Sequence, residues 1–350
     1  MAPDPIVYAE MGRHKAMVVS QLEWGRAIDA GKARGIEVFT PQTLGIDAAQ
    51  RSSPEMWIKT LLKRFGVCQL SVPGDFPHGI ACALKASRFK VRVLDRPPFP
   101  KRRSKRPDEV RNIAQSQRAA VLAMRSACSL IRSADIDAKG QLRIRGKRLK
   151  SETVQRRIAD VLLDHDSFCA DTIVSCGRQA ANPHERGHGP LLAHTPIVID
   201  IFPQHLKHGY WGDITRTVLR GTAEPKLKQM YAAVKAAHTA ALRRVSPGVS
   251  CISVHRAAAA VFQKRGFETS RQGDRTVGFI HSTGHGVGLA IHEAPSVGAS
   301  RSRLRIGDVI TIEPGLYYPD LGGIRIEDTI VVTEAGGQYL VPCEKHFEYR

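Results

Sequence analysis

Five polar side chains in the second half of this 350-residue chain restrict its fold more than any other feature. In order along the chain they are Asp200, Asp213, His285, Glu313 and Glu327. Carboxylate oxygens with a single imidazole nitrogen form a donor set suited to a pair of divalent cations. The four carboxylates also carry the four negative charges that two dications neutralise. We therefore expect a fold in which these distant residues meet at one dinuclear metal centre.

Each of these residues also has an ordinary structural explanation. A single aspartate at a strand end usually caps a turn, and a lone histidine is more often a hydrogen-bonded core or surface group than a ligand. The segment Glu-Pro-Gly after Ile312 is by itself a turn. The order and settings of the five residues together favour metal binding over coincidence. Without metal, the four carboxylates would repel one another and take up protons.

Strand periodicity indicates which neighbours share the metal-facing side. Thr215 and Thr217 lie on the same face as Asp213, and Arg325 lies on the same face as Glu327. His285 stands between two glycines, and such small neighbours let the backbone approach a ligand closely.

Length and composition predict two domains and no membrane span. A chain of 350 residues with 42% hydrophobic and 24% charged residues is typical of a globular protein with more than one core. No run of eighteen apolar residues occurs, and the first residues lack the pattern of a signal peptide. The seven cysteines are scattered without a Cys-x-x-Cys pair, which indicates reduced thiols and a cytoplasmic location.

The pattern of apolar residues divides the chain into an α/β N-terminal domain at 1–95, a basic linker at 96–106 and a larger domain at 107–350. In the first domain, strands at 17–20, 36–40, 67–71 and 89–94 alternate with helices at 21–34, 53–65 and 77–87. In the larger domain we expect helices at 107–133, 151–165, 224–244 and 250–264. We also expect strands at 173–175, 197–200 and 213–219, the last two paired antiparallel, and a strand-and-loop region at 277–332.

The net charge of +19 is concentrated between Lys85 and Lys150, above all in the run Lys101-Arg-Arg-Ser-Lys-Arg106. One interpretation is a contact with RNA, a ribosome or other nucleic acid. The other is a solvated linker, and we favour it because no aromatic residues interrupt the run to stack on bases.

The motifs around the five residues resemble those of the methionine aminopeptidase, prolidase and Xaa-Pro aminopeptidase family. They are Val-Ile-Asp, Gly-Asp-Ile-Thr-Arg-Thr, Gly-His-Gly-Val-Gly, Ile-Glu-Pro-Gly-Leu-Tyr and Gly-Gly-Ile-Arg-Ile-Glu-Asp, and the likeness covers residues 107 to 340. The resemblance implies a pita-bread fold, mixed α/β with a curved antiparallel sheet. It also implies that Asp200 chelates one metal, that Asp213 and Glu327 bridge both, and that His285 and Glu313 bind the second, with Glu313 as general base.

Four further residues resemble those of the prolidase and Xaa-Pro branch. By this resemblance His184 and His292 are catalytic and contact the substrate, His281 and His292 line the proline-side pocket, and Arg325 binds substrate or supports the metal site. One departure is the sequence Ile201-Phe-Pro203 and a longer connection to Asp213, with His205 and His208 expected in an exposed loop.

The resemblance implies hydrolysis of N-terminal peptide bonds by two divalent cations and a bridging hydroxide. Xaa-Pro aminopeptidase or Xaa-Pro dipeptidase activity is the expectation, with manganese as the metal and cobalt, zinc or iron as alternatives. A methionine-type aminopeptidase and a catalytically silent binding protein that contacts RNA through the basic segment are the competing hypotheses. We expect a peptide or dipeptide substrate, a homodimer, no membrane partner, and nucleic acid only as the less favoured alternative.

Overall fold

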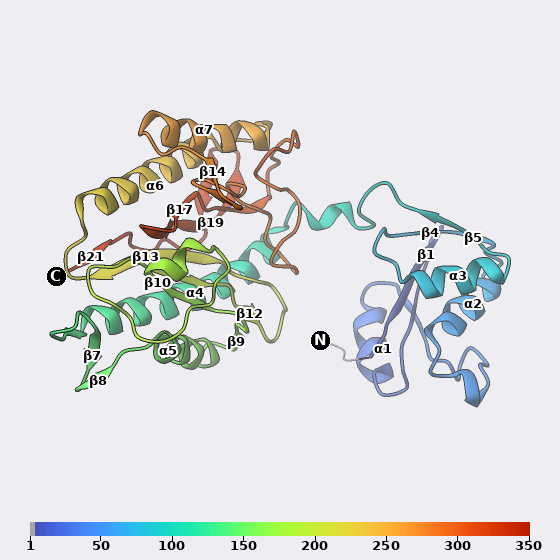
Figure 1. Cartoon of the computed structure of the whole chain (residues 1–350). Helices are drawn as coiled ribbons and strands as arrows, with labels where there is room; N and C mark the ends of the chain where they lie inside the picture. The colour runs from blue at the N-terminus through green and yellow to red at the C-terminus, as the bar shows by residue number, and fades with distance from the viewer. Residues whose placement is uncertain (1–3) are drawn as a thin grey trace. The chain divides into compact units, whose positions relative to one another are not determined.

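The computed structural model describes residues 4–350 and divides the chain into two compact units. The first ends at Pro100 and the second runs from Lys101 to Arg350 (Figure 1). The expected linker at 96–106 therefore falls on both sides of the division. Within residues 4–350, no helix is both long enough and apolar enough to span a membrane.

The N-terminal unit alternates short strands and helices, as its sequence predicts. Its strands are β1 (Val7–Met11), β2 (His14–Val18), β3 (Glu37–Phe39), β4 (Gln69–Val72) and β5 (Lys90–Val93), and its helices are α1 (Trp24–Lys32), α2 (Pro54–Arg64) and α3 (His78–Ala86). β1, β2 and β3 form one sheet, while β4 and β5 pair in parallel. The hairpin of β1 and β2 was not predicted, because β1 is only partly buried and lacks a clear apolar alternation.

Four helices of the second unit agree with the sequence pattern. They are α4 (Pro107–Arg132), α5 (Ser151–Leu163), α6 (Pro225–Arg244) and α7 (Cys251–Lys264). α4 begins at a proline in its first turn, and the Glu109 carboxylate accepts a hydrogen bond from the Arg106 backbone N–H at 2.9 Å. Ala120 and Met124 of its buried stripe pack in one core with three strands of the principal sheet, and Ile113 belongs to a smaller cluster with Val309.

The principal sheet of the second unit has the strand order β10-β11-β13-β19-β16, with β20 added to β19 and β21 to β13. The bounds are β10 Ile173–Cys176, β11 Ile197–Ile201, β13 Ile214–Arg220, β16 Val309–Ile312, β19 Glu327–Thr333, β20 Gly336–Tyr339 and β21 Glu348–Tyr349. The predicted antiparallel pair is confirmed, since β11 runs antiparallel to β13. In this register Asp200 lies opposite Thr215, and Thr215 lies opposite Glu327 on the next strand. The three side chains therefore form one row across three neighbouring strands.

Shorter strands frame this sheet. They are β6 (Asp135–Ile136), β7 (Leu142–Ile144), β8 (Lys147–Arg148), β9 (Ser167–Phe168), β12 (Gln204–His205), β14 (Ser270–Gln272), β15 (Arg275–Val277), β17 (Gly315–Tyr318) and β18 (Gly322–Arg325). One apolar core joins α4 and α5 to β10, β11 and β13, and a second joins α6 and α7 to the strands after residue 309. Figure 1 shows the two helix pairs on two sides of the strands. The row of polar residues runs from β11 across β13 to β19, where the strands that pack on α4 and α5 meet those that pack on α6 and α7.

The basic segment at 101–106 differs from the expected solvated linker. The Arg103 guanidinium contacts the fully buried carboxylate of Asp308 at 2.8 Å, and the ammonium group of Lys105, itself almost fully buried, lies 2.6 Å from Glu293. The expectation was wrong for these two residues because each neutralises a carboxylate that the fold has removed from water.

Candidate metal centre

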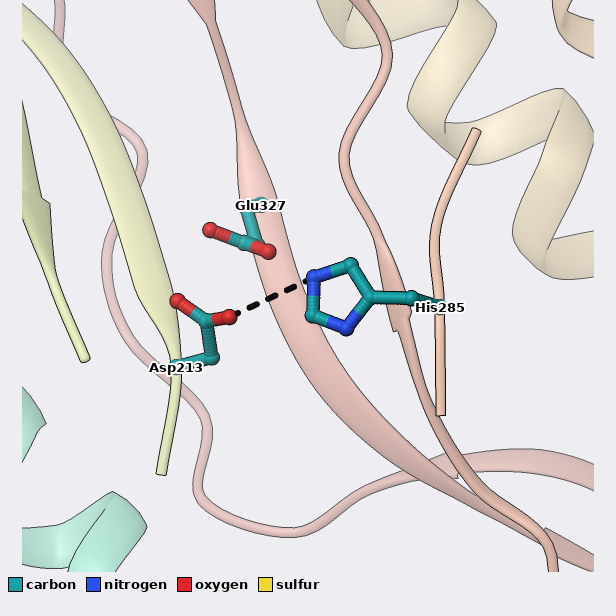
Figure 2. A group of neighbouring side chains, drawn as sticks. All are labelled: Asp213, His285 and Glu327. Atoms are coloured by element: carbon teal, nitrogen blue, oxygen red, sulfur yellow. Dashed lines mark ion pairs between the residues drawn. The ribbon is translucent and has the colours of Figure 1, made fainter. Parts of the chain in front are cut away.

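Three of the predicted ligands converge on one small space. One donor atom each of Asp213, His285 and Glu327 lies within 4.8 Å of the other two (Figure 2). Asp213 immediately precedes β13, Glu327 begins β19, and His285 lies in the loop before β16. Two carboxylates and one imidazole with these separations can chelate a cation placed between them.

The imidazole of His285 presents an unprotonated nitrogen to the carboxylates. Its Nδ1 donates to the Gly286 carbonyl at 3.2 Å, which leaves Nε2 as the acceptor nitrogen. Nε2 lies 3.5 Å from Asp213 Oδ2, the approach marked in Figure 2, and 3.4 Å from Glu313 Oε1. Burial, followed by the neighbouring His292, lowers the pKa of His285 to about 4. A neutral imidazole lone pair that faces two acidic oxygens is a fitting place for a cation.

The backbone of His285 is held by the strand that leads to Glu313. The Thr311 N–H donates to the His285 carbonyl at 2.8 Å, and the His285 N–H donates to the Thr311 hydroxyl at 3.1 Å. A Cβ atom at Gly284 would lie only 1.9 Å from the Thr311 carbonyl oxygen. Glycine is therefore required there, because only its backbone can approach β16 this closely.

The hydroxyl of Thr215 joins the other two carboxylates. Its Oγ1 lies 2.9 Å from Asp200 Oδ1 and 2.7 Å from Glu327 Oε2, and it accepts a hydrogen bond from Arg325 Nε at 3.1 Å. The one hydroxyl is therefore within hydrogen-bond distance of both carboxyl groups. Thr215 thus connects Asp200 to Glu327, which already lies beside Asp213 and His285. All the candidate ligands therefore belong to one cluster.

The guanidinium of Arg325 is buried and directed entirely into the protein. It donates to Asp200 Oδ2 at 2.8 Å and to the Tyr317 hydroxyl at 2.7 Å, in addition to Thr215. Desolvation alone would lower the pKa of Arg325, but Tyr317, Asp200 and the glutamates raise it above its ordinary value. These contacts join Arg325 to the candidate ligand Asp200, and both of its predicted roles stay predictions.

Three of the acidic residues have raised pKa values in the metal-free protein. Burial first, then the neighbouring carboxylates, raises the pKa of Asp213 and that of Glu327 well above their ordinary values. Burial raises the pKa of Glu313 to about 7 against the opposing effect of Arg325, and Asp200 adds to the increase. Carboxylates in a space that disfavours their negative charge are suited to divalent cations, which remove the repulsion.

Helix α4 fixes the backbone at Asp213. The side-chain amide of Gln117 donates to the Asp213 carbonyl at 2.9 Å and accepts from the Asp213 N–H at 2.7 Å. The Ser116 hydroxyl donates to the Tyr210 carbonyl at 2.9 Å. A Cβ atom at Gly212 would lie 2.6 Å from the Gln117 nitrogen, so the connection from Asp200 rests directly on α4.

Contrary to the prediction, the two histidines of this connection are not exposed, although Leu206 and Lys207 between them are. His205 is buried and stacks on half-buried His208 with ring centroids 3.8 Å apart. The Nδ1 atoms of the two rings accept hydrogen bonds from the N–H groups of Lys207 and Tyr210, both at 3.2 Å. The prediction failed because the histidines turn inward beneath their own loop, where burial lowers the pKa of both.

A second charged cluster lies on the opposite face of the same strands. Arg216 donates to Asp328 Oδ1 at 2.6 Å, and it also donates to the backbone carbonyls of Thr215 at 2.8 Å and Glu327 at 2.6 Å. Lys345 Nζ lies 2.6 Å and His238 Nε2 3.0 Å from Asp328 Oδ2. Burial alone would raise the pKa of Asp328, but Arg216, His238 and Lys345 hold it far below its usual range. This cluster fixes β13 against β19, and thereby the backbone beneath the candidate ligands.

The four residues predicted beyond the metal ligands lie in two kinds of environment. The rings of His292 and His285 meet edge to face with centroids 4.3 Å apart, and the side chains of His184 and His292 are exposed. His281 is half-buried, and both of its ring nitrogens are used within the protein: Nδ1 lies 2.7 Å from the Ser282 carbonyl and Nε2 3.0 Å from the Tyr317 hydroxyl. A substrate contact by His281 stays a prediction, while its contacts directly show that it orients Tyr317.

Three residues of the site were not predicted from the sequence: Gln117, Tyr317 and Asp328. The sequence contains an indication for Gln117, because a polar residue on the apolar stripe of an amphipathic helix needs a buried hydrogen-bond partner. Asp328 had one as well, since it follows Glu327 and points to the opposite face of a buried strand. Tyr317 had none, because a tyrosine in an apolar strand is an ordinary core residue.

Comparison with known proteins agrees with this geometry. Residues 111–334 match the family model described as Metallopeptidase family M24. The chain is 37% identical to the Xaa-Pro dipeptidase of Pyrococcus furiosus over 176 residues, which are 50% of this chain and 48% of that protein. It is 34% identical to the Xaa-Pro dipeptidase of Lactobacillus helveticus over 186 residues, 52% of this chain and 46% of that protein. The matched segment thus spans about half the length of these relatives.

Solved structures resemble almost the whole chain. The prolidase from Pyrococcus horikoshii OT3 superposes with a TM-score of 0.78 at 26% identity, covering 97% of this chain and 88% of that one. The Xaa-Pro dipeptidase from Bacillus anthracis superposes with a TM-score of 0.82 at 23% identity, covering 99% of this chain and 90% of that one. At this identity the likeness shows only that the fold is shared. The expected pita-bread fold is confirmed.

Proposed function

Because this chain belongs to metallopeptidase family M24, we propose that it hydrolyses Xaa-Pro dipeptides at a centre of two divalent cations. The observation that carries the proposal is the convergence of Asp213, His285 and Glu327 donor atoms within 4.8 Å, with Thr215 connecting Asp200 to the same cluster. Several sequence relatives are named Xaa-Pro dipeptidase, which supports dipeptides over longer peptides.

The five predicted ligands are the residues that would hold the cations. Asp200 would serve one ion, His285 and Glu313 the other, and Asp213 and Glu327 would serve both. Bound divalent cations lower the pKa of water and polarise a substrate carbonyl. Their oxygen-rich donor set supports manganese, with cobalt, zinc or iron as alternatives.

Glu313 is the general base of the proposed reaction. When the centre holds its cations, the ionised Glu313 carboxylate would be the group that takes a proton from water and returns it. The Thr311 hydroxyl, 3.3 Å from Glu313 Oε1, holds the carboxyl group in place. The proton then passes to the leaving nitrogen, which in an Xaa-Pro bond is the tertiary amide nitrogen of proline and needs protonation to depart.

His184 and His292 contact the substrate. Burial and His184 lower the pKa of His292, so its neutral ring can donate a hydrogen bond to the developing oxyanion without adding positive charge beside the cations. A pocket of about 410 Å³ is lined by Pro183, the residue before His184, and by Ile280 and Tyr317. Its partly apolar wall suits a proline ring. The homodimer and the cytoplasmic location remain predictions.

One assay panel tests the proposal. The metal-free protein is incubated with Mn²⁺, Co²⁺ or Zn²⁺ and with Ala-Pro, Ala-Pro-Ala or Met-Ala-Ser. We expect metal-dependent cleavage of Ala-Pro, whereas preference for Ala-Pro-Ala would indicate an aminopeptidase and release of Met a methionine-type enzyme. Glu313→Gln should abolish cleavage, and Glu334→Gln, which changes an exposed glutamate, serves as the matched control. Full activity of Glu313→Gln would refute the role of Glu313 as base.

A further inference from the structure

The carboxylate of Glu293, the residue after His292, is held by the basic segment. Lys105 Nζ lies 2.6 Å from Glu293 Oε1, and Arg102 donates to Oε2 at 3.0 Å. The side chain of Lys105 is 1% exposed and that of Glu293 is 12% exposed. A lysine this deeply buried loses most of its hydration, so its position depends on the carboxylate that it contacts.

Glu293 closes the loop that places His292 on His285. The backbones of Gly286 and Glu293 exchange two hydrogen bonds, each 2.9 Å long, so the intervening residues form a closed loop. A Cβ atom at Gly288 would lie 2.4 Å from the Glu293 carboxylate, which shows how closely the loop wraps around this group. The Glu293 side chain therefore packs against the loop that carries the neighbouring imidazole.

The same basic segment anchors the strand that leads to Glu313. Arg103 donates to both oxygens of Asp308, at 3.1 and 2.8 Å, and to the Ser302 hydroxyl at 2.7 Å. The Lys105 N–H donates to the Gly307 carbonyl at 2.8 Å. Asp308 directly precedes β16, so one short stretch of chain fixes both the histidine loop and the strand beside it.

We infer that Lys105 is a positioning residue, which acts through Glu293 to hold His292 against the metal centre. This inference rests on the proposed function for its catalytic consequence. It gives the basic segment an internal role, because the charges of Arg103 and Lys105 are already neutralised by Asp308 and Glu293 and are not available to the phosphates of a nucleic acid. If His292 donates its hydrogen bond to the substrate only in the transition state, displacing that ring lowers the kcat of the enzyme. The affinity for the substrate then stays nearly unchanged.

The test combines hydrogen exchange with kinetics on the whole 350-residue chain loaded with manganese. Lys105→Met removes the charge and keeps the apolar stem, and Lys101→Met, in an exposed position of the same segment, is the matched control. We expect the amides of Gly286 and Glu293 to exchange at least about tenfold faster in Lys105→Met, and not in the control. We also expect kcat per mole of folded, metal-loaded enzyme to fall by about tenfold, with little change in KM.

A double-mutant cycle separates positioning from general destabilisation. If Lys105 acts through His292, then Lys105→Met combined with His292→Ala is no slower than His292→Ala alone. Independent, multiplicative losses would overturn the inference. So would exchange rates at the two amides that match those of the Lys101→Met control. If Lys105→Met does not fold, Glu293→Gln, which keeps the shape and removes the partner charge, replaces it with the same expected results.

The two possible failures are distinguishable. If the wild-type protein cleaves no peptide with any metal, the proposed function fails, and the exchange rates still decide whether Lys105 holds the loop. If the wild-type protein is active but the exchange rates and kcat are unaffected by Lys105→Met, only the positioning role fails.

Discussion

The metal-free protein should lose stability as the pH rises through 7. The carboxyl group of Glu313 has an ordinary pKa of 4.5, and the folded protein raises it to about 7. Between these values the folded state holds a proton that the unfolded chain has lost, so the free energy of unfolding falls with increasing pH. The stabilisation is complete below pH 4.5 and is lost above 7. A difference of this size corresponds to about 3 kcal/mol. Asp213 and Glu327, whose pKa values are also raised, add to the slope in the same direction.

Urea unfolding of EDTA-treated protein at several pH values between 5 and 8 measures this slope. Glu313→Gln stays neutral at every pH, so it should remove about 3 kcal/mol of the decrease, while the exposed-site control Glu334→Gln should leave it unchanged. Addition of Mn²⁺ should reverse the trend, because a cation competes with protons for the same oxygens and binds better at higher pH. A metal-free protein whose stability rises from pH 5 to 8, or a Glu313→Gln variant with the wild-type slope, would refute the reasoning.

Three substitutions test the support around the ligands. Thr215→Val keeps the shape but removes the hydroxyl between Asp200 and Glu327, and should weaken metal binding by about tenfold in calorimetric titration; unchanged affinity would contradict the bridging role of the hydroxyl. Arg325→Lys preserves the charge but cannot reproduce the forked contacts, so kcat/KM for Ala-Pro should fall by about 10–100-fold. Asp328→Asn leaves Arg216 without its buried counter-charge and should lower the free energy of unfolding by about 3–5 kcal/mol in urea; a loss below 1 kcal/mol would show that this cluster is not needed to hold the strands.

The ligand candidates could be predicted because short motifs identify them. Asp200 and Glu313 stand in sequences whose strand character is local, and Thr215 could be placed on the metal face by its spacing from Asp213. The bridge from Thr215 to Asp200 and Glu327 could not be predicted, because it requires β13 to lie between β11 and β19. That order is decided by packing between distant segments rather than by the residues of any one strand.

Which charges of the basic segment are buried could not be predicted from the sequence either. A run of lysines and arginines is usually solvated, and nothing within the run distinguishes Lys105 from Lys101. The difference is a carboxylate 188 residues later in the chain, which the fold buries beside Lys105. Likewise, His205 belongs to a polar connection whose packing against α4 no local pattern reveals.

The most direct test of the dinuclear centre is a count of bound metal. The EDTA-treated protein is titrated with Mn²⁺ in a calorimeter, and the metal content of the dialysed complex is measured by mass spectrometry. We predict about two ions per chain, about one in Asp200→Asn, and less than one in Asp213→Asn, since in the proposed centre Asp213 serves both ions. Binding of two ions to Asp213→Asn with unchanged affinity, or of none to the wild-type protein, would contradict the account.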